Sequence, residues 1–181
     1  GKVVGHNAFL VGEIKLIPPD IASSEVEVIP ESLPATGTDN RAVIRLTNMV
    51  DALGNPIPDG TKVAVTAGNV CSSYNGTVYS EGGTIVGGEE ASGTSGSWCS
   101  ADKFRIFTVQ DGVLEVVYSD VGITYPAGTV KKARVQFLPV DNEMRVVGHN
   151  ANVVVEIPLA GIGEATFIPS QDWIVAGGPE V

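Results

Sequence analysis

The chain has 181 residues, 43% of them apolar, and 21 acidic against 11 basic residues give it a formal net charge of −10 at pH 7. This size and apolar content are sufficient for a buried core, so they exclude a chain that is disordered by composition. The negative charge repels phosphate backbones and anionic membranes, and no run reaches the roughly 18 apolar residues of a membrane helix. We therefore expect neither a nucleic-acid partner nor insertion into a membrane.

The first element in chain order belongs to an internal repeat. Residues 3–16 read VVGHNAFLVGEIKL and residues 146–159 read VVGHNANVVVEIPL, with ten of the fourteen positions identical at an offset of 143 residues. Alternating apolar residues predict that both copies form strands. Residues 1–19 are therefore expected to be a strand extension that copies the closing strand of a central unit. As an assembly strand, it would use the side chains of Val3, Val4, Phe9, Val11, Ile14 and Leu16.

The central unit spans residues 20–159 and is expected to contain seven or eight strands. Apolar alternation and flanking turn residues predict strands at residues 25–29, 41–48, 61–67, 103–109, 113–119, 130–140 and 145–159. In the strand at 130–140, Lys131, Arg134 and Gln136 are expected to face outward. No window has helical periodicity over three turns. This pattern predicts an all-β protein with a β-sandwich fold.

Residues 160–181 resemble the beginning of the central unit. Residues 164–169 read EATFIP, as residues 25–30 read EVEVIP, and in each copy a glycine turn follows the Ile-Pro pair. This similarity predicts a C-terminal strand extension that opens a following unit.

Residues 68–102 form a long insertion rich in glycine, serine and threonine, and they contain both cysteines of the chain, Cys71 and Cys99. We expect a disulfide between them, because closing a loop of roughly 30 residues is worth about 3 kcal/mol in the chain-entropy model. The alternative is two free buried thiols. A disulfide indicates an oxidising compartment, so we expect an extracellular or cell-surface location.

Three aromatic residues share this insertion: Tyr74, Tyr79 and Trp98. Aromatic side chains on a loop-rich rim can stack on sugars or anchor a protein partner. They are candidate binding residues for a surface glycan or a protein receptor. The alternative for Trp98 is that it covers the disulfide and the edge of the core.

Residues 41–68, which read RAVIRLTNMVDALGNPIPDGTKVAVTAG, resemble the group 1 bacterial immunoglobulin-like domains of invasin- and intimin-type surface proteins. The resemblance extends over about residues 35–138. It implies an immunoglobulin-like β-sandwich that is repeated in tandem as a rigid spacer or an adhesive tip. The insertion at 68–102 departs from the family pattern. The matching positions are Asp51, Gly54, Asn55, Pro56, Ile57, Asp59 and Gly60, followed by Asp111, Gly112 and Gly128.

No catalytic motif is present, so we expect that the protein is not an enzyme. Glu89 and Glu90 are adjacent carboxylates in a loop, and His6 and His149 occupy equivalent places in the two repeat copies. No cofactor is expected apart from one alternative, Ca²⁺ shared by aspartates at junctions between modules. The other interpretation of these aspartates is that they form turns. They are Asp51, Asp59, Asp111, Asp120 and Asp141.

The sequence leaves three functions open. The first is a structural module of an extracellular or cell-surface bacterial protein, serving as a rigid spacer or assembly unit. The second is a subunit of an extracellular filament assembled head to tail by strand exchange. The third is an adhesive module that binds a glycan or receptor through residues 68–102. The expected partners are copies of the chain itself or neighbouring immunoglobulin-like modules.

Overall fold

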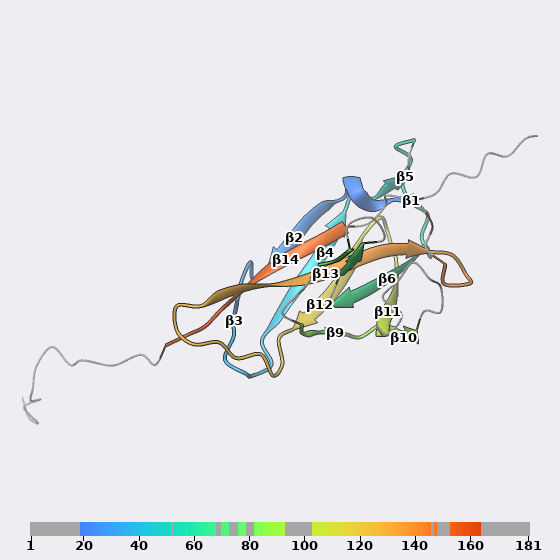
Figure 1. The fold of residues 1–181 in the computed structure, drawn as a ribbon. Helices are drawn as coiled ribbons and strands as arrows, with labels where there is room; N and C mark the ends of the chain where they lie inside the picture. Colours follow the sequence, from blue (N-terminus) through green and yellow to red (C-terminus); the bar gives the residue numbers. More distant parts are fainter. Residues whose placement is uncertain are drawn as a thin grey trace, which may run out of the picture.

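The computed structural model describes residues 19–51, 53–67, 70–72, 76–78, 82–92, 103–145, 147 and 153–163. These residues form a β-sandwich of two sheets packed face to face (Figure 1). The short 3₁₀ turn η1 (Ile21–Ser23) precedes the first long strand. Within the described residues, no helix has the length and hydrophobicity to cross a membrane.

The first sheet is antiparallel and contains four strands. Their order is β2 (Glu25–Ile29), β4 (Arg41–Thr47), β12 (Leu114–Ser119) and β9 (Thr84–Val86). On its outer face the register places Arg45 between Glu27 and Glu115. The Arg45 guanidinium lies 3.6 Å from the Glu27 carboxylate and 2.8 Å from that of Glu115. This exposed row of alternating charge faces water.

The second sheet contains six strands. Their order is β10 (Glu89–Ser92), β11 (Lys103–Thr108), β6 (Lys62–Ala67), β13 (Val130–Val140), β14 (Val153–Ala160) and β3 (Leu33–Pro34). Neighbouring strands are antiparallel except for β14 and β3, which pair in parallel. Two further short pairs are β1 (Pro19–Asp20) with β5 (Val50–Asp51), and β7 (Val70–Ser72) with β8 (Gly76–Val78).

The predicted strands are confirmed over the described residues, except at the start of the last one. The prediction begins this strand at residue 145; β14 is described from Val153, and residues 146 and 148–152 lie outside the described residues. Residues 141–145 form a turn instead, because the Asp141 carboxylate accepts hydrogen bonds from the backbone N–H groups of Glu143 (2.8 Å) and Arg145 (2.9 Å).

The core lies between the inner faces of the two sheets. β14 shows the alternation most clearly, since Val153, Val155 and Ile157 are buried while Val154 and Glu156 are exposed. The side chains of Tyr118 and Phe137 are the largest of those that are fully buried. The other members of this core with the lowest exposure are Ile21, Ala42, Ile44, Leu46, Val63, Val65, Val109, Ala133, Val135, Ile157 and Leu159.

A second, smaller cluster lies on the outer face of the six-stranded sheet. It contains Ala64, Phe104, Ile106 and Val140. Gln136 is buried as well, which corrects the expectation that it faces water. The Gln136 side chain points to the expected face of the sheet, away from the main core. This part of the outer face is itself buried.

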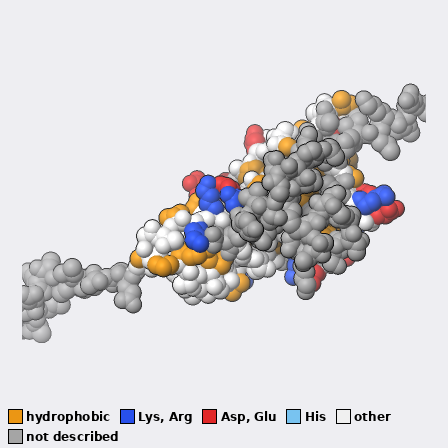
Figure 2. Space-filling view, viewed as in Figure 1, with side chains coloured by type: hydrophobic (Ala, Val, Ile, Leu, Met, Phe, Trp, Pro, Cys, Tyr) orange, Lys and Arg blue, Asp and Glu red, His pale blue; other side chains and the backbone are white. Residues whose placement is uncertain are grey.

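The chain runs from one end of the sandwich to the other (Figure 1). The proximal end contains β1, η1 and the loops that follow β5 and β13. The distal end contains residues 30–40, the loop 120–129 and residues 161–163. Figure 2 shows hydrophobic side chains near the point where the chain leaves β14 at the distal end, and mixed charges over the body of the sandwich.

Two isoleucines of the first sheet should differ greatly in what they contribute to the free energy of unfolding. Ile44 is 0% exposed in the core, whereas Ile29 is 53% exposed. Ile44→Ala should therefore lower the free energy of unfolding by about 2–5 kcal/mol through lost burial and a cavity. Ile29→Ala should change it by less than about 0.5 kcal/mol. Urea unfolding of both variants checks the difference, and equal losses would contradict the placement of the core.

Candidate functional site

The distal end is built from two loops that are joined backbone to backbone. The Gly37 N–H donates to the carbonyl of Ile123 at 2.8 Å, and the Tyr125 N–H donates to the carbonyl of Ala35 at 3.2 Å. Gly37 has a positive φ of 83°, and an added Cβ there would lie 2.7 Å from the Thr124 hydroxyl oxygen. Glycine is therefore required at this position both by backbone conformation and by space.

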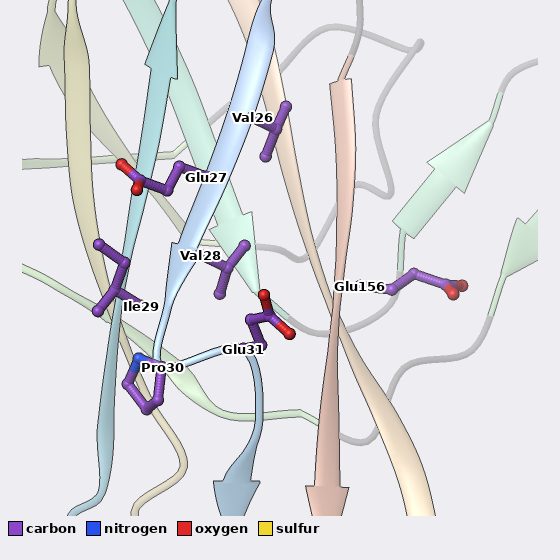
Figure 3. Close-up of a pocket in the computed structure, with 7 residues that line it drawn as sticks. All are labelled: Val26, Glu27, Val28, Ile29, Pro30, Glu31 and Glu156. Atoms are coloured by element: carbon purple, nitrogen blue, oxygen red, sulfur yellow. The ribbon is translucent and has the colours of Figure 1, made fainter.

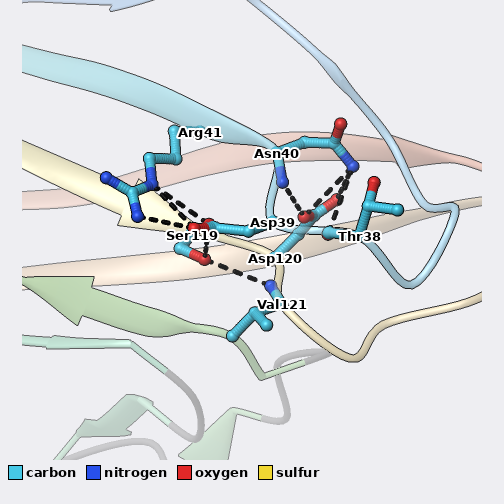
Figure 4. A network of polar contacts seen from close by, with 7 residues as sticks. All are labelled: Thr38, Asp39, Asn40, Arg41, Ser119, Asp120 and Val121. Atoms are coloured by element: carbon cyan, nitrogen blue, oxygen red, sulfur yellow. Dashed lines mark hydrogen bonds and ion pairs between the residues drawn. The ribbon is translucent and has the colours of Figure 1, made fainter.

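A buried carboxylate joins these loops below their surface. Asp120 follows β12 and is 0% exposed. Its carboxylate accepts hydrogen bonds from the backbone N–H of Asn40 at 2.9 Å and from the Asn40 side-chain amide at 3.2 and 3.3 Å (Figure 4). The same amide donates to the carbonyl of Pro34 at 2.7 Å. Asn40 thus provides hydrogen-bond donors to the buried Asp120 carboxyl group. It also ties β3 to the end of β12, although these two strands lie far apart in the sequence.

Asp39, the residue before Asn40, faces the opposite side of the loop and holds a second set of contacts (Figure 4). Its carboxylate lies 2.5 Å from the Arg41 guanidinium and accepts a hydrogen bond from the Ser119 hydroxyl at 2.6 Å. The Ser119 oxygen in turn accepts from the backbone N–H of Val121 at 3.2 Å. The hydrogen bonds from Arg41 and Ser119 lower the pKa of Asp39 to about 2.

The chain leaves the sandwich against these loops. The Ala35 N–H donates to the carbonyl of Ala160 at 2.8 Å, and the Gly161 N–H donates to the carbonyl of Thr129 at 2.7 Å. An added Cβ at Gly161 would collide with the carbonyl oxygen of Pro126. The position and direction of the chain at its exit are therefore fixed by the loop 120–129.

The proximal end holds the chain where it begins the sandwich. β1 pairs with β5, and Ile21 in η1 is 0% exposed within the main core. Asp51, at the end of β5, accepts hydrogen bonds from the backbone N–H groups of Leu53 (2.8 Å) and Asn55 (2.9 Å). The motif that carries the family resemblance thus forms a tight turn beside β1, and hydrogen bonds from the Asn55 side-chain amide and from the backbone of the turn lower the pKa of Asp51.

The aspartates considered for Ca²⁺ are spread over both ends, and Asp51, Asp120 and Asp141 accept hydrogen bonds from protein groups. Asp51 and Asp141 cap turns, Asp120 is held by Asn40, and Asp111 adopts a positive φ of 50° in the turn between β11 and β12. In the described part of the chain, no group of three or more His, Cys, Asp or Glu side chains could hold a metal ion. The turn-forming interpretation accounts for the contacts of Asp51 and Asp141.

Several predicted site residues lie outside the described residues. They are the assembly strand at 3–16, both histidines, Cys99 and the three aromatic residues Tyr74, Tyr79 and Trp98. The backbone of Cys71 lies in β7, but its side chain is not described. The disulfide and the binding role of the insertion therefore stay predictions. Glu89 and Glu90 are exposed on the edge strand β10, and Glu90 lies 3.4 Å from Arg105.

An open groove of about 600 Å³ runs beside the edge strand β2 (Figure 3). Val26 and Val28 lie on the side of β2 that faces β14, while Glu27 and Ile29 lie on the other side. Glu156 of β14 contributes to the lining, and it is paired with Lys132 and with Arg134 at 2.8 Å. Among the described residues, the groove lining includes three glutamates but no histidine, cysteine, serine or threonine.

Sequence reasoning missed the residues that matter most at the distal end, Asn40, Ser119 and Gly161. The sequence carries only an indirect sign of them, because Asp39 and Asn40 come directly before a strong strand and Asp120 directly follows another. Nothing local in the sequence shows that these two strand ends meet.

Comparison with known proteins gave no match: no family model, no curated protein and no solved structure matches the chain. The features that bear on function are therefore the fold, the internal repeat and the two ends of the sandwich.

The Asn40–Asp120 contact predicts a marked loss of stability when the amide is removed. Asn40→Ala leaves a buried carboxylate with fewer donors, so the free energy of unfolding should fall by about 1–3 kcal/mol. Thr38→Ala, two residues away on an exposed position, should change it by less than about 0.5 kcal/mol. Denaturant unfolding of both variants measures this, and a silent Asn40→Ala would contradict the role of the contact.

The contacts of Asp39 predict how stability responds to acid. Because the pKa of Asp39 is lowered from 3.8 to about 2 on folding, its ionised form favours the folded state above pH 4, and this contribution is lost as the pH falls from 4 to 2. Asp39→Asn should reduce the slope of stability against pH in that window. The lowered pKa values of Asp51, Asp141 and Glu156 act in the same direction and preserve part of the slope. Unfolding at pH 2–5 tests this, and an unchanged slope would count against it.

Proposed function

We propose that the chain is a structural module of an extracellular or cell-surface bacterial protein, that it acts as a rigid spacer between neighbouring modules, and that it is not an enzyme. The observation that carries this proposal is the path of the chain, which begins the sandwich at the proximal end and leaves it at the distal end (Figure 1). Both points are tied to the body, by β1 and Ile21 at one end and by Ala160 and Gly161 at the other. Modules joined in this way extend in a line.

The strand order supports an immunoglobulin-like topology for this module. In such folds strands A, B, E and D form one sheet, and strands C, F and G form the other. The order β2–β4–β12–β9 corresponds to the first sheet, and β6–β13–β14 corresponds to the second. The hairpin of β10 and β11 is an addition at the edge next to β6. The resemblance to group 1 bacterial immunoglobulin-like domains agrees with this order.

The terminal strands suit a module under tension. β2 begins at the proximal end and β14 finishes at the distal end, and both lie along the direction in which a tandem chain would pull (Figure 1). Tension along this axis loads the ladders of β2 with β4 and of β14 with β13 in shear. The hydrogen bonds of a ladder loaded in shear must break together rather than one after another, which resists extension.

The edge of β2 favours the spacer over a filament made by strand exchange along this edge. Glu25, Glu27 and Glu31 lie on or next to β2, and Pro30 ends the strand. Charged residues and proline on an edge strand oppose the addition of another strand. The filament remains the second candidate through the predicted assembly strand at 3–16, and the adhesive module is the candidate that depends on the insertion at 68–102.

Pulling experiments on the full chain test the spacer. Handles at the two chain termini should require a higher force to unfold the sandwich than handles at Val130 and Ile162. These two residues are both exposed at the distal end, and pulling them apart would peel β14 from β13, beginning at the pair Val130 and Ala160. Single-molecule force spectroscopy measures both directions. An axial unfolding force equal to or below the peeling force would contradict the proposal.

A further inference from the structure

Ile162 is a large apolar residue that lies exposed at the distal end. Its side chain is 59% exposed, although isoleucine is among the residues most often buried. Gly161 and Gly163 flank it, and a Cβ on either glycine would point at Pro126 or at Ala127. The two glycines therefore lie against the turn at 126–127, and Ile162 between them points away from the sandwich that it follows.

An isoleucine at the proximal end also precedes an opening strand but has the opposite environment. Ile21 is 0% exposed within the main core, and it precedes the opening strand β2 by four residues. Ile162 precedes Glu164 by two residues, and Glu164 begins the EATFIP segment that resembles EVEVIP at 25–30. Each opening strand is thus preceded by one isoleucine.

The connection on the distal side is the shorter of the two. By the repeat offset of 143, Ile17 corresponds to Ala160 at the end of β14, so seven residues separate Ile17 from Glu25, whereas three separate Ala160 from Glu164. The shorter connection spans at most about 14 Å, against about 29 Å for the longer one. A unit that begins at Glu164 must therefore lie directly against the distal end, where Val121 and Val130 are also exposed.

We propose that Ile162 is a core residue of the following unit, where it fills the place that Ile21 fills in this one. This inference rests on the proposed function, since it requires a second unit in tandem. The linker, residues 161–163, is held on the first unit by the 2.7 Å hydrogen bond from the Gly161 N–H to the Thr129 carbonyl, and it places Ile162 against the next unit. The surface around Val121, Val130 and Ile162 is then the interface with the proximal end of the next unit, where the counterpart of the exposed Leu53 lies.

A two-unit chain tests the proposal. Residues 1–163 are joined directly to residues 25–181, so that the second unit has the natural linker but lacks its own Ile21. We expect both units to fold, and we expect Ile162→Ser to lower the melting midpoint of one unit by several degrees. In the single chain of 181 residues, Ile162→Ser should leave the midpoint unchanged, whereas Ile21→Ser should lower it. Val154→Ser, at a position 42% exposed on β14, is the matched control and should be silent in both chains.

The position of Ile162 in the two-unit chain gives a second readout. Its δ-methyl signal in a ¹³C-labelled sample should shift relative to the single chain and show contacts to the second unit. An unshifted signal, a silent Ile162→Ser or a second unit that does not fold would each overturn the proposal. X-ray scattering distinguishes failure of this proposal from failure of the spacer. An extended two-unit particle in which Ile162→Ser is silent supports the spacer and overturns the role of Ile162. Two units that lie side by side contradict the spacer itself.

Discussion

The structure depends on keeping water out of the layer between the two sheets. The long strands of both sheets present apolar side chains to this layer, and the side chains of Tyr118, Phe137 and their neighbours are fully buried there. A sandwich of this kind is open at its two ends, where no sheet covers the core. The ends must be closed by loops and by segments that connect the strands, and here those same segments carry the chain into and out of the module.

The two ends solve this problem with different chemistry. The proximal end is closed by an apolar side chain, Ile21, and by turns such as the one that Asp51 organises. The distal end is closed by polar loops around the buried Asp120, whose cost of desolvation is offset by hydrogen bonds from Asn40. Polar contacts have strict geometry, so the distal loops hold the direction of the departing chain, whereas the apolar packing of Ile21 at the proximal end depends less on direction.

The sequence predicted the strands well because their apolar and β-branched runs are bounded by turn residues. The strand at 130–140 was predicted with its exact limits, and the first strand at 25–29 likewise. Alternation could not reveal the burial of Gln136, since a second cluster on the outer face breaks the simple rule that polar residues face water. The contact between Asn40 and Asp120 was also beyond reach, because it joins residues 80 positions apart and depends on which strand ends meet.

For a spacer, the length of β13 sets a ratio between folded and stretched size. With 11 residues it spans roughly 36 Å along the sandwich. One repeat of 143 residues, fully stretched, reaches roughly 500 Å. The stretched repeat is therefore more than ten times as long as β13. A tether made of such modules can yield one unit at a time under a sudden pull, dissipating mechanical work before any covalent bond or attachment point has to break.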